Sequence, residues 1–206
     1  MFNSWNKDMF IEALRQFKTA SILLVVFIIL TGVIYPYAVT AIAQLLFPWQ
    51  ANGSLIQSQN NIIASLLIGQ SFTDKKYFWG RPSATQPFPY NAASSTGSNM
   101  GPSNPDFLKT IENRVAQLQG SSTQNILVPV DLVTTSASGL DPEITPQAAF
   151  FQISRIAQAR DMSTFDLNQL VQDHIKPREL GFLGEFRVNV LELNLALDQI
   201  SIIRKE

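Results

Sequence analysis

Cysteine is absent from this sequence of 206 residues, and histidine occurs once, at position 174. Without cysteine the chain has no thiol nucleophile, no disulfide and no cysteine-based zinc site. A zinc ion needs three or four nitrogen, sulfur or oxygen ligands, and a single histidine does not supply them. We therefore expect neither a resident metal nor thiol chemistry.

Charge is also scarce, and it is unevenly placed. Charged residues make up 15% of the chain, against about a quarter in a typical soluble domain. Residues 19–73 contain no Asp, Glu, Lys or Arg. The net charge of −1 offers no basic surplus for nucleic acid and no acidic tail for a cationic partner.

The uncharged stretch begins with a long apolar run. Residues 21–30 are almost entirely apolar, and this character continues with small and polar interruptions to Phe47. About 20 apolar residues in a helix cross the hydrocarbon core of a bilayer. The sequence therefore predicts one transmembrane helix over residues 19–46, in which Gly32 and Pro36 are tolerated.

The basic residues predict how this helix is oriented. Lys7, Arg15 and Lys18 precede it, and no basic residue follows until Lys75. The positive-inside rule then places residues 1–18 in the cytoplasm and residues 47–206 outside the inner membrane. A cleaved signal peptide ending at Ala43 is the alternative. The apolar run resumes directly after that position, which favours a retained anchor.

Residues 47–206 read as one exported α+β domain, because strand and helix patterns mix without a strict βαβ rhythm. Strands are expected at 53–57 and 62–68 (a hairpin), 77–81, 126–134 (an edge strand with Pro129) and 188–191. Helices are expected after the caps Asn104, Thr145 and Ser163. Residues 193–200 fit either a strand or a helical turn.

Residues 82–105 are rich in Pro, Ser, Gly and Asn and show no apolar period. The pattern predicts a long irregular loop. Loops of this length in a compact domain are usually functional or disordered. Phe88 and Tyr90 favour an ordered loop, and such aromatic residues are common anchors in interfaces.

Motifs for catalysis are weak. A serine hydrolase would need His174 with Ser136 or Ser138, yet no G-x-S-x-G elbow is present. Neither phosphate-binding glycine motif occurs. The phosphorylation signature Asp-Lys-Thr-Gly-Thr of P-type ATPases is also absent, so this chain is not expected to hydrolyse ATP itself. A membrane-tethered hydrolase and an exported binding module remain alternatives.

A few polar residues stand out beside the aromatic ones. Arg81 follows Phe78 and Trp79, so it fits either pairing with a carboxylate or a structural role that ties down the long loop. The expected partner-interface residues are Arg81, Phe88, Tyr90, Asn99 and Asn104.

Eight short segments resemble, in order, the C subunit of the Kdp potassium-transporting P-type ATPase. They are residues 31–36, 52–56, 67–70, 77–84, 98–105, 128–131, 138–142 and 187–191. One departure is Glu143, where that family often carries histidine; it leaves the resemblance intact.

The resemblance implies a single-pass subunit of an inner-membrane complex. A channel-like subunit would bind potassium and a P-type subunit would hydrolyse ATP, so this chain needs no cofactor of its own. The family is described as a catalytic chaperone that raises the ATP affinity of the hydrolysing subunit. An exported domain does not reach cytoplasmic ATP, so the effect would be indirect.

Overall fold

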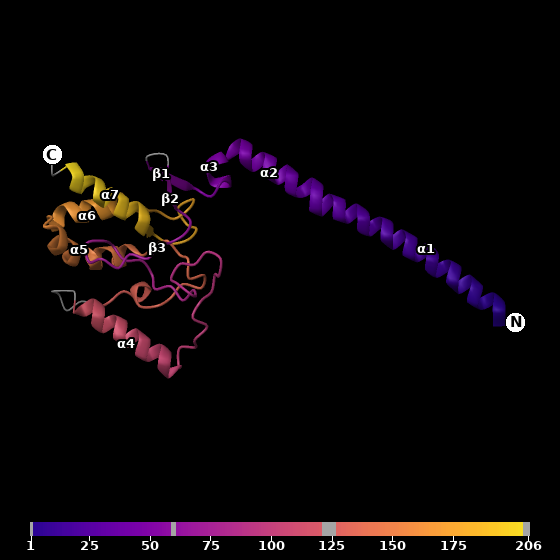
Figure 1. Cartoon of the computed structure of the whole chain (residues 1–206), viewed down its shortest axis with the longest axis horizontal. Coiled ribbons are helices and arrows are strands. Elements are labelled where there is room, and N and C mark those ends of the chain that lie inside the picture. The colour runs from indigo at the N-terminus through magenta and orange to yellow at the C-terminus, as the bar shows by residue number, and fades with distance from the viewer. Residues whose placement is uncertain (1, 59–60, 121–126, 204–206) are drawn as a thin grey trace. The chain divides into compact units, whose positions relative to one another are not determined.

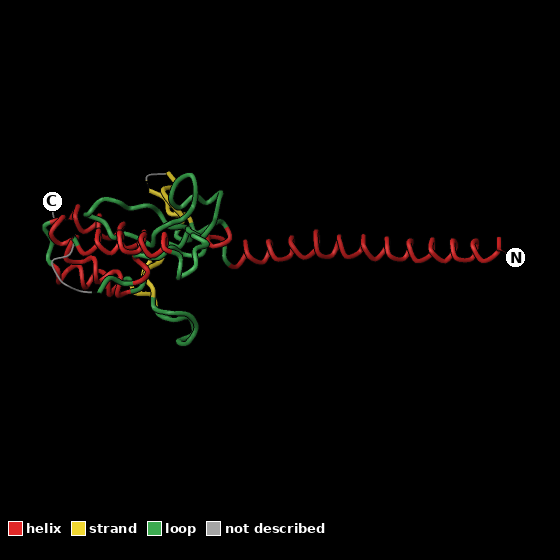
Figure 2. Tube along the Cα trace, turned by 90° about the horizontal axis from the view of Figure 1, so that it is seen from below, coloured by secondary structure: helices red, strands yellow, loops and turns green. Residues whose placement is uncertain are grey.

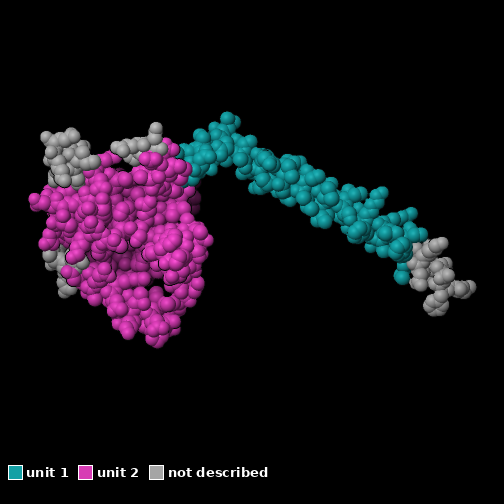
Figure 3. Space-filling view, viewed as in Figure 1, with its two compact units in different colours: residues 1–54 teal, residues 55–206 magenta. Residues whose placement is uncertain are grey.

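The computed structural model describes residues 2–58, 61–120 and 127–203. The chain divides into two compact units, residues 1–54 and residues 55–206 (Figure 3). Each unit is described by itself below.

The first unit is a long helix. It consists of α1 (Phe2–Ile29), a π-helical turn η1 (Leu30–Ile34) and α2 (Tyr35–Leu46), followed by the short helix α3 (Pro48–Ala51) (Figure 1). The apolar stretch Met9–Leu46 is 38 residues long. Its most apolar 18 residues are not buried by any of the described residues. Length and composition confirm the single N-terminal transmembrane helix.

The π-helical turn lies just before Pro36. Proline cannot donate the backbone hydrogen bond that continues an α-helix, so the preceding turn must rearrange its carbonyl partners. The Thr31 hydroxyl donates to the Phe27 carbonyl at 2.7 Å within this region. The helix thereby continues through Gly32 and Pro36, as the sequence predicted.

The second unit mixes helices with two small antiparallel sheets, which confirms the α+β class. β1 (Leu55–Ser58) pairs with β2 (Asn61–Ser65) as the expected hairpin, with an irregularity after Ile56. The second sheet has the order β3 (Glu143–Ile144), β5 (Arg187–Asn189), β4 (Ile175–Lys176). In Figure 2 the helices of this unit gather at one end and its loops at the other.

Helices α4 (Pro105–Gln119), α5 (Pro146–Arg160) and α6 (Thr164–Asp173) begin where their caps predicted. Asn104 accepts from the Asp106 amide at 2.8 Å, and Thr145 and Ser163 cap α5 and α6 in the same way. The ambiguous tail is helical: α7 spans Val190–Ile203. α5 packs against α6, and α6 against α7, around the core.

Two strand predictions are wrong. Residues 77–81 form no strand, because their backbone groups bond to side-chain amides, as described below. Residue 126 lies outside the described residues, and Val130–Leu132 is a short 3-10 helix. Asp131, Leu132 and Val133 are all buried, which a strand with alternating faces would not produce.

The predicted strand over 188–191 ends early. β5 stops at Asn189, whose side-chain oxygen accepts from the amides of Leu191 and Glu192 at 3.1 Å each. An asparagine whose side chain accepts from the amides two and three residues ahead caps the start of a helix. The chain therefore turns into α7 at Val190.

Candidate functional site

The segment 77–81 is held in place by two buried amide side chains. Asn194 of α7 accepts from the Phe78 amide at 2.8 Å and donates to the Phe78 carbonyl at 2.9 Å. Gln152 of α5 does the same for Trp79, at 2.8 and 3.1 Å. Each amide replaces one residue of a neighbouring strand, so both backbone groups of Phe78 and of Trp79 are bonded without belonging to a sheet.

Arg155 secures the same segment from α5. Its guanidinium donates to the carbonyls of Lys75 and Tyr77 and to Gln152 Oε1, and it lies 4.0 Å from the centre of the Trp79 ring. Burial lowers the pKa of Arg155 to about 10. Arg155 therefore holds the backbone of the segment that precedes Arg81 in place.

Arg81 connects this segment to residues 133–142. Its Nη1 lies 3.2 Å from Asp141 Oδ2, and its Nη2 donates to the Thr135 carbonyl at 3.3 Å. Its Nε is buried and has no hydrogen-bond partner in the described part of the chain. Arg81 therefore pairs with a carboxylate, which is one of the two roles considered for it. The carbonyl that it bonds belongs to Thr135, outside the long loop 82–105.

The first half of the long loop is fastened by hydroxyl groups. Ser83 Oγ donates to the Gly139 carbonyl at 2.7 Å and accepts from the Tyr90 amide at 2.9 Å. Thr85 Oγ1 donates to the Phe88 carbonyl at 2.8 Å and accepts from the Asn91 amide at 2.9 Å. These bonds confirm an irregular but ordered loop over residues 83–91.

Tyr90 packs inward. Its hydroxyl donates to the Arg81 carbonyl at 2.5 Å, and its ring lies where side chains at Gly69 and Gly80 would collide with it. A Cβ at Gly69 would be 2.3 Å from Tyr90 Cε1, so glycine is required there for space. Burial, and then the Asp141 charge, raise the pKa of Tyr90 to about 12.

The remaining interface candidates lie differently. Phe88 is 57% exposed, and Asn99 is exposed with a φ of 52°. Asn104 is half-buried and caps α4. The interface role of these five residues stays a prediction.

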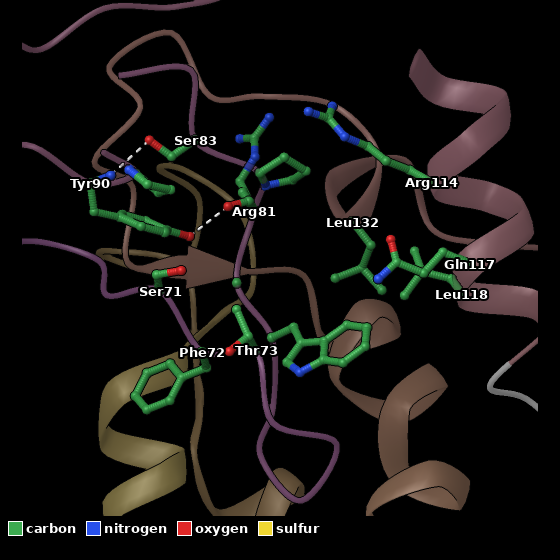
Figure 4. Close-up of a pocket in the computed structure, with 14 residues that line it drawn as sticks. Ser71, Phe72, Thr73, Arg81, Ser83, Tyr90, Arg114, Gln117, Leu118 and Leu132 are labelled. Atoms are coloured by element: carbon green, nitrogen blue, oxygen red, sulfur yellow. Dashed lines mark hydrogen bonds between the residues drawn. The ribbon is translucent and has the colours of Figure 1, made fainter. Parts of the chain in front are cut away.

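A hollow of about 480 Å³ opens beside these residues (Figure 4). Arg81 and Tyr90 lie on one side of it, and Arg114 and Leu118 of α4 lie on the other; Trp79 also lines it. The sequence analysis did not connect α4 to Arg81, because the two segments meet only in the folded domain.

The residues considered for a hydrolase lie apart. Ser136 and Ser138 line a hollow with Arg81 and Asp141, whereas His174 lines a different one with Lys176 and Glu192. His174 Nδ1 is 2.8 Å from the Leu170 carbonyl at the end of its own helix. The Ser138 hydroxyl accepts from the Leu140 amide at 3.1 Å. Both side chains serve local backbone groups.

Sequence reasoning also missed an exposed apolar group on the loop between β4 and β5. The apolar tip consists of Leu180, Phe182, Leu183 and Phe186, which are 82%, 69%, 49% and 50% exposed. The density of apolar residues between charged ones in this loop is the sequence pattern that could have identified the apolar tip.

Cross-strand bonds shape the loop that carries the apolar tip. Glu179 and Leu183 exchange two backbone hydrogen bonds, at 2.8 and 2.9 Å. Arg178 pairs with Glu185 at 2.6 Å, and Arg187 pairs with Glu179 at 2.8 Å. The charged side chains are thus paired with one another, and the apolar ones are left facing solvent.

Comparison with known proteins gives a consistent picture. Residues 17–199 match the family model described as KdpC: K+-transporting ATPase, c chain. A potassium-transporting ATPase KdpC subunit from Herpetosiphon aurantiacus is 55% identical over 89% of this chain and 96% of its own. The corresponding subunits from Methylococcus capsulatus and Polynucleobacter asymbioticus are 53% and 54% identical, over 91% and 85% of this chain and 99% and 94% of their own. The chain therefore belongs to the KdpC family, the c chains of the K+-transporting ATPase.

Proposed function

We propose that this chain is a non-catalytic accessory subunit of an ATP-driven potassium uptake complex, and that it assembles with a channel-like subunit and an ATP-hydrolysing subunit. The observation that carries the proposal is the apolar helix Met9–Leu46, whose most apolar 18-residue stretch is not buried by any of the described residues. In a membrane such a helix is covered by lipid or by neighbouring helices. Membership of the KdpC family supports cover by the helices of other subunits in addition to lipid.

The proposed orientation has residues 1–18 in the cytoplasm and the second unit outside. ATP and potassium are then handled by the other subunits. This chain raises the ATP affinity of the hydrolysing subunit by binding one pump conformation more tightly than another. A subunit that binds one conformation more tightly increases the population of that conformation. It therefore also raises the affinity of any ligand, such as ATP, that prefers the same conformation.

The exposed aromatic and aliphatic side chains are the proposed contacts outside the membrane. Phe88 and the apolar tip face solvent in the isolated chain, and apolar side chains of this size are typical centres of protein interfaces. The arginines beside the tip are already paired with glutamates, which favours an apolar protein surface over anionic lipid headgroups.

The decisive experiment compares complexes purified with and without this chain. We expect the complex that lacks it to show a higher KM for ATP, with kcat affected less. Substitutions Ser138→Ala and His174→Ala serve as controls and are expected to leave transport unchanged. If either control abolishes transport in an assembled complex, the chain has a catalytic role and the accessory assignment fails.

A further inference from the structure

The hollow between the long loop and α4 has an unusual set of walls. Its volume of about 480 Å³ lies in the range of small-molecule sites. Phe72, Trp79, Leu118 and Leu132 give it apolar surfaces, while Arg81 and Arg114 bring two guanidinium groups to it. Figure 4 shows these two groups projecting toward the same end of the hollow.

The charges around the hollow do not balance. Its described lining contains two arginines and no aspartate or glutamate. Asp141 pairs with Arg81 but is not part of the lining. Within the described residues, no carboxylate lies within salt-bridge distance of Arg114, whose guanidinium donates from Nη1 to the Val133 carbonyl at 2.7 Å. The positive charge of Arg114 therefore has no carboxylate partner among the described residues.

Arg114 is also partly withdrawn from water. Burial lowers its pKa, and no neighbouring carboxylate acts against that shift. A desolvated cation gains more from an anion than an exposed cation does, because the local dielectric constant is lower. Helix α4 thus holds a cation in surroundings that favour a counter-ion.

The donor groups that remain free have a definite geometry. Since Nη1 of Arg114 is bonded to Val133, the Nε–Nη2 edge remains available, and this edge matches the two oxygens of a carboxylate. Trp79 and Leu118 provide apolar surface for the body of a ligand.

We propose that this hollow binds a carboxylate group carried on an apolar body, with the Nε–Nη2 edge of Arg114 as its main contact. The ligand is either a free small carboxylate or an aspartate or glutamate side chain of a partner subunit. Both sources have the same chemistry, and the experiment below distinguishes them.

The test uses the full chain in detergent, with benzoate as the charged probe and benzamide as its neutral counterpart. The Arg114 Nε–H resonance, assigned by its loss in Arg114→Gln, is followed through each titration. We expect saturable shifts with benzoate and none with benzamide. The Arg114→Gln variant should bind benzoate at least about tenfold more weakly, a change of about 1.4 kcal/mol.

Lys109→Gln is the matched control, since Lys109 is exposed on the same helix. It should leave the benzoate affinity unchanged. Arg114→Lys keeps the charge without the two-pronged edge and should bind with intermediate affinity. Equal effects of Arg114→Gln and Lys109→Gln, equal binding of benzamide, or the absence of saturable shifts in the wild-type chain would each overturn the proposal.

A second titration, on the assembled complex, identifies the natural source. Loss of benzoate binding on assembly shows that a partner carboxylate fills the hollow. Unchanged binding shows that the site serves a free carboxylate. The carboxylate assignment itself is decided by the first titration and does not depend on the accessory function proposed above.

Discussion

Buried amide side chains replace a β-strand in this domain. Asn194 is 2% exposed and Gln152 is 1% exposed, and each bonds both backbone groups of one residue in the segment 77–81. A buried N–H or carbonyl group without a partner costs about 1–3 kcal/mol. These two side chains therefore matter more to the fold than most apolar contacts of similar size.

We predict that Asn194→Ala lowers the free energy of unfolding by about 3 kcal/mol, because it leaves the Phe78 amide and carbonyl unpaired. Urea unfolding of the full chain in detergent, followed by tryptophan fluorescence, measures the change. Gln199→Ala, an exposed position on the same helix, should stay within about 0.5 kcal/mol of the wild type. Equal stability of the two variants would show that the amide bonds are dispensable.

We predict that the protein loses stability at alkaline pH because of Tyr90. Its pKa is raised to about 12 in the folded protein, from 10.0. The folded state therefore holds the phenol proton more tightly than the unfolded state does. The resulting stability is complete below pH 10 and is lost as the pH rises from 10 to 12.

The matched comparison is with Tyr90→Phe, which has no phenol proton. Between pH 9 and 11.5 the wild type should lose about 2 kcal/mol more of its free energy of unfolding than the variant does. Comparing the two proteins cancels the other alkaline titrations, including that of Arg155. Parallel pH profiles would show that the Tyr90 hydroxyl is exposed to solvent in the folded protein.

At the scale of elements, the sequence predicted what local chemistry determines. Asn104, Thr145 and Ser163 start helices because each cap bonds amides within three residues of itself. The strand prediction for residues 77–81 was wrong because the hydrogen-bond partners of this segment lie far along the chain. Gln152 is 73 residues beyond Trp79, and Asn194 is 116 residues beyond Phe78. No local pattern encodes those distances.

The candidate site divides in the same way. Arg81 and Tyr90 could be singled out as a charged and an aromatic residue in an irregular loop. Their direct contact at 2.5 Å forms within the loop itself, across nine residues. The approach of Arg114 to the same hollow depends on packing between distant segments. The apolar tip was accessible to sequence reasoning, because its four apolar residues fall within positions 180–186 between paired charges.

The apolar tip gives a prediction at this scale. Leu180→Ser together with Phe182→Ser should weaken assembly about thirtyfold, since buried interface anchors commonly contribute 2 kcal/mol or more. Stability should stay within about 0.5 kcal/mol because both side chains face solvent. Affinity is measured by titrating the tagged chain into complexes that lack it.

Phe165→Ser provides the matched control, because Phe165 is 75% exposed but lies on α6, outside the tip. Phe88→Ala and Tyr90→Ala separate the two aromatic residues of the long loop. The first should affect assembly and the second stability, since only Tyr90 packs inward. If Phe165→Ser weakens assembly as much as the tip variants do, general surface hydrophobicity is responsible rather than the tip.

For the whole molecule, the question is which side of the membrane each unit occupies. A retained helix, with the basic residues before it, predicts a cytoplasmic N-terminus and an outside domain. Cleavage after Ala43 would instead release residues 44–206 from their anchor. The intact mass of the membrane-extracted protein distinguishes these cases, and we expect the mass of a chain that retains the helix.

The absence of cysteine makes the orientation directly testable, because any single cysteine introduced is the only thiol in the chain. Ser94→Cys lies in the exposed part of the long loop, and Ser4→Cys lies before the basic residues. A maleimide that cannot cross the inner membrane should label Ser94→Cys in intact cells and leave Ser4→Cys unlabelled until the membrane is opened. The reverse pattern would place the domain in the cytoplasm, where it could contact the ATP-hydrolysing subunit directly, and would remove the need for coupling through the membrane helix.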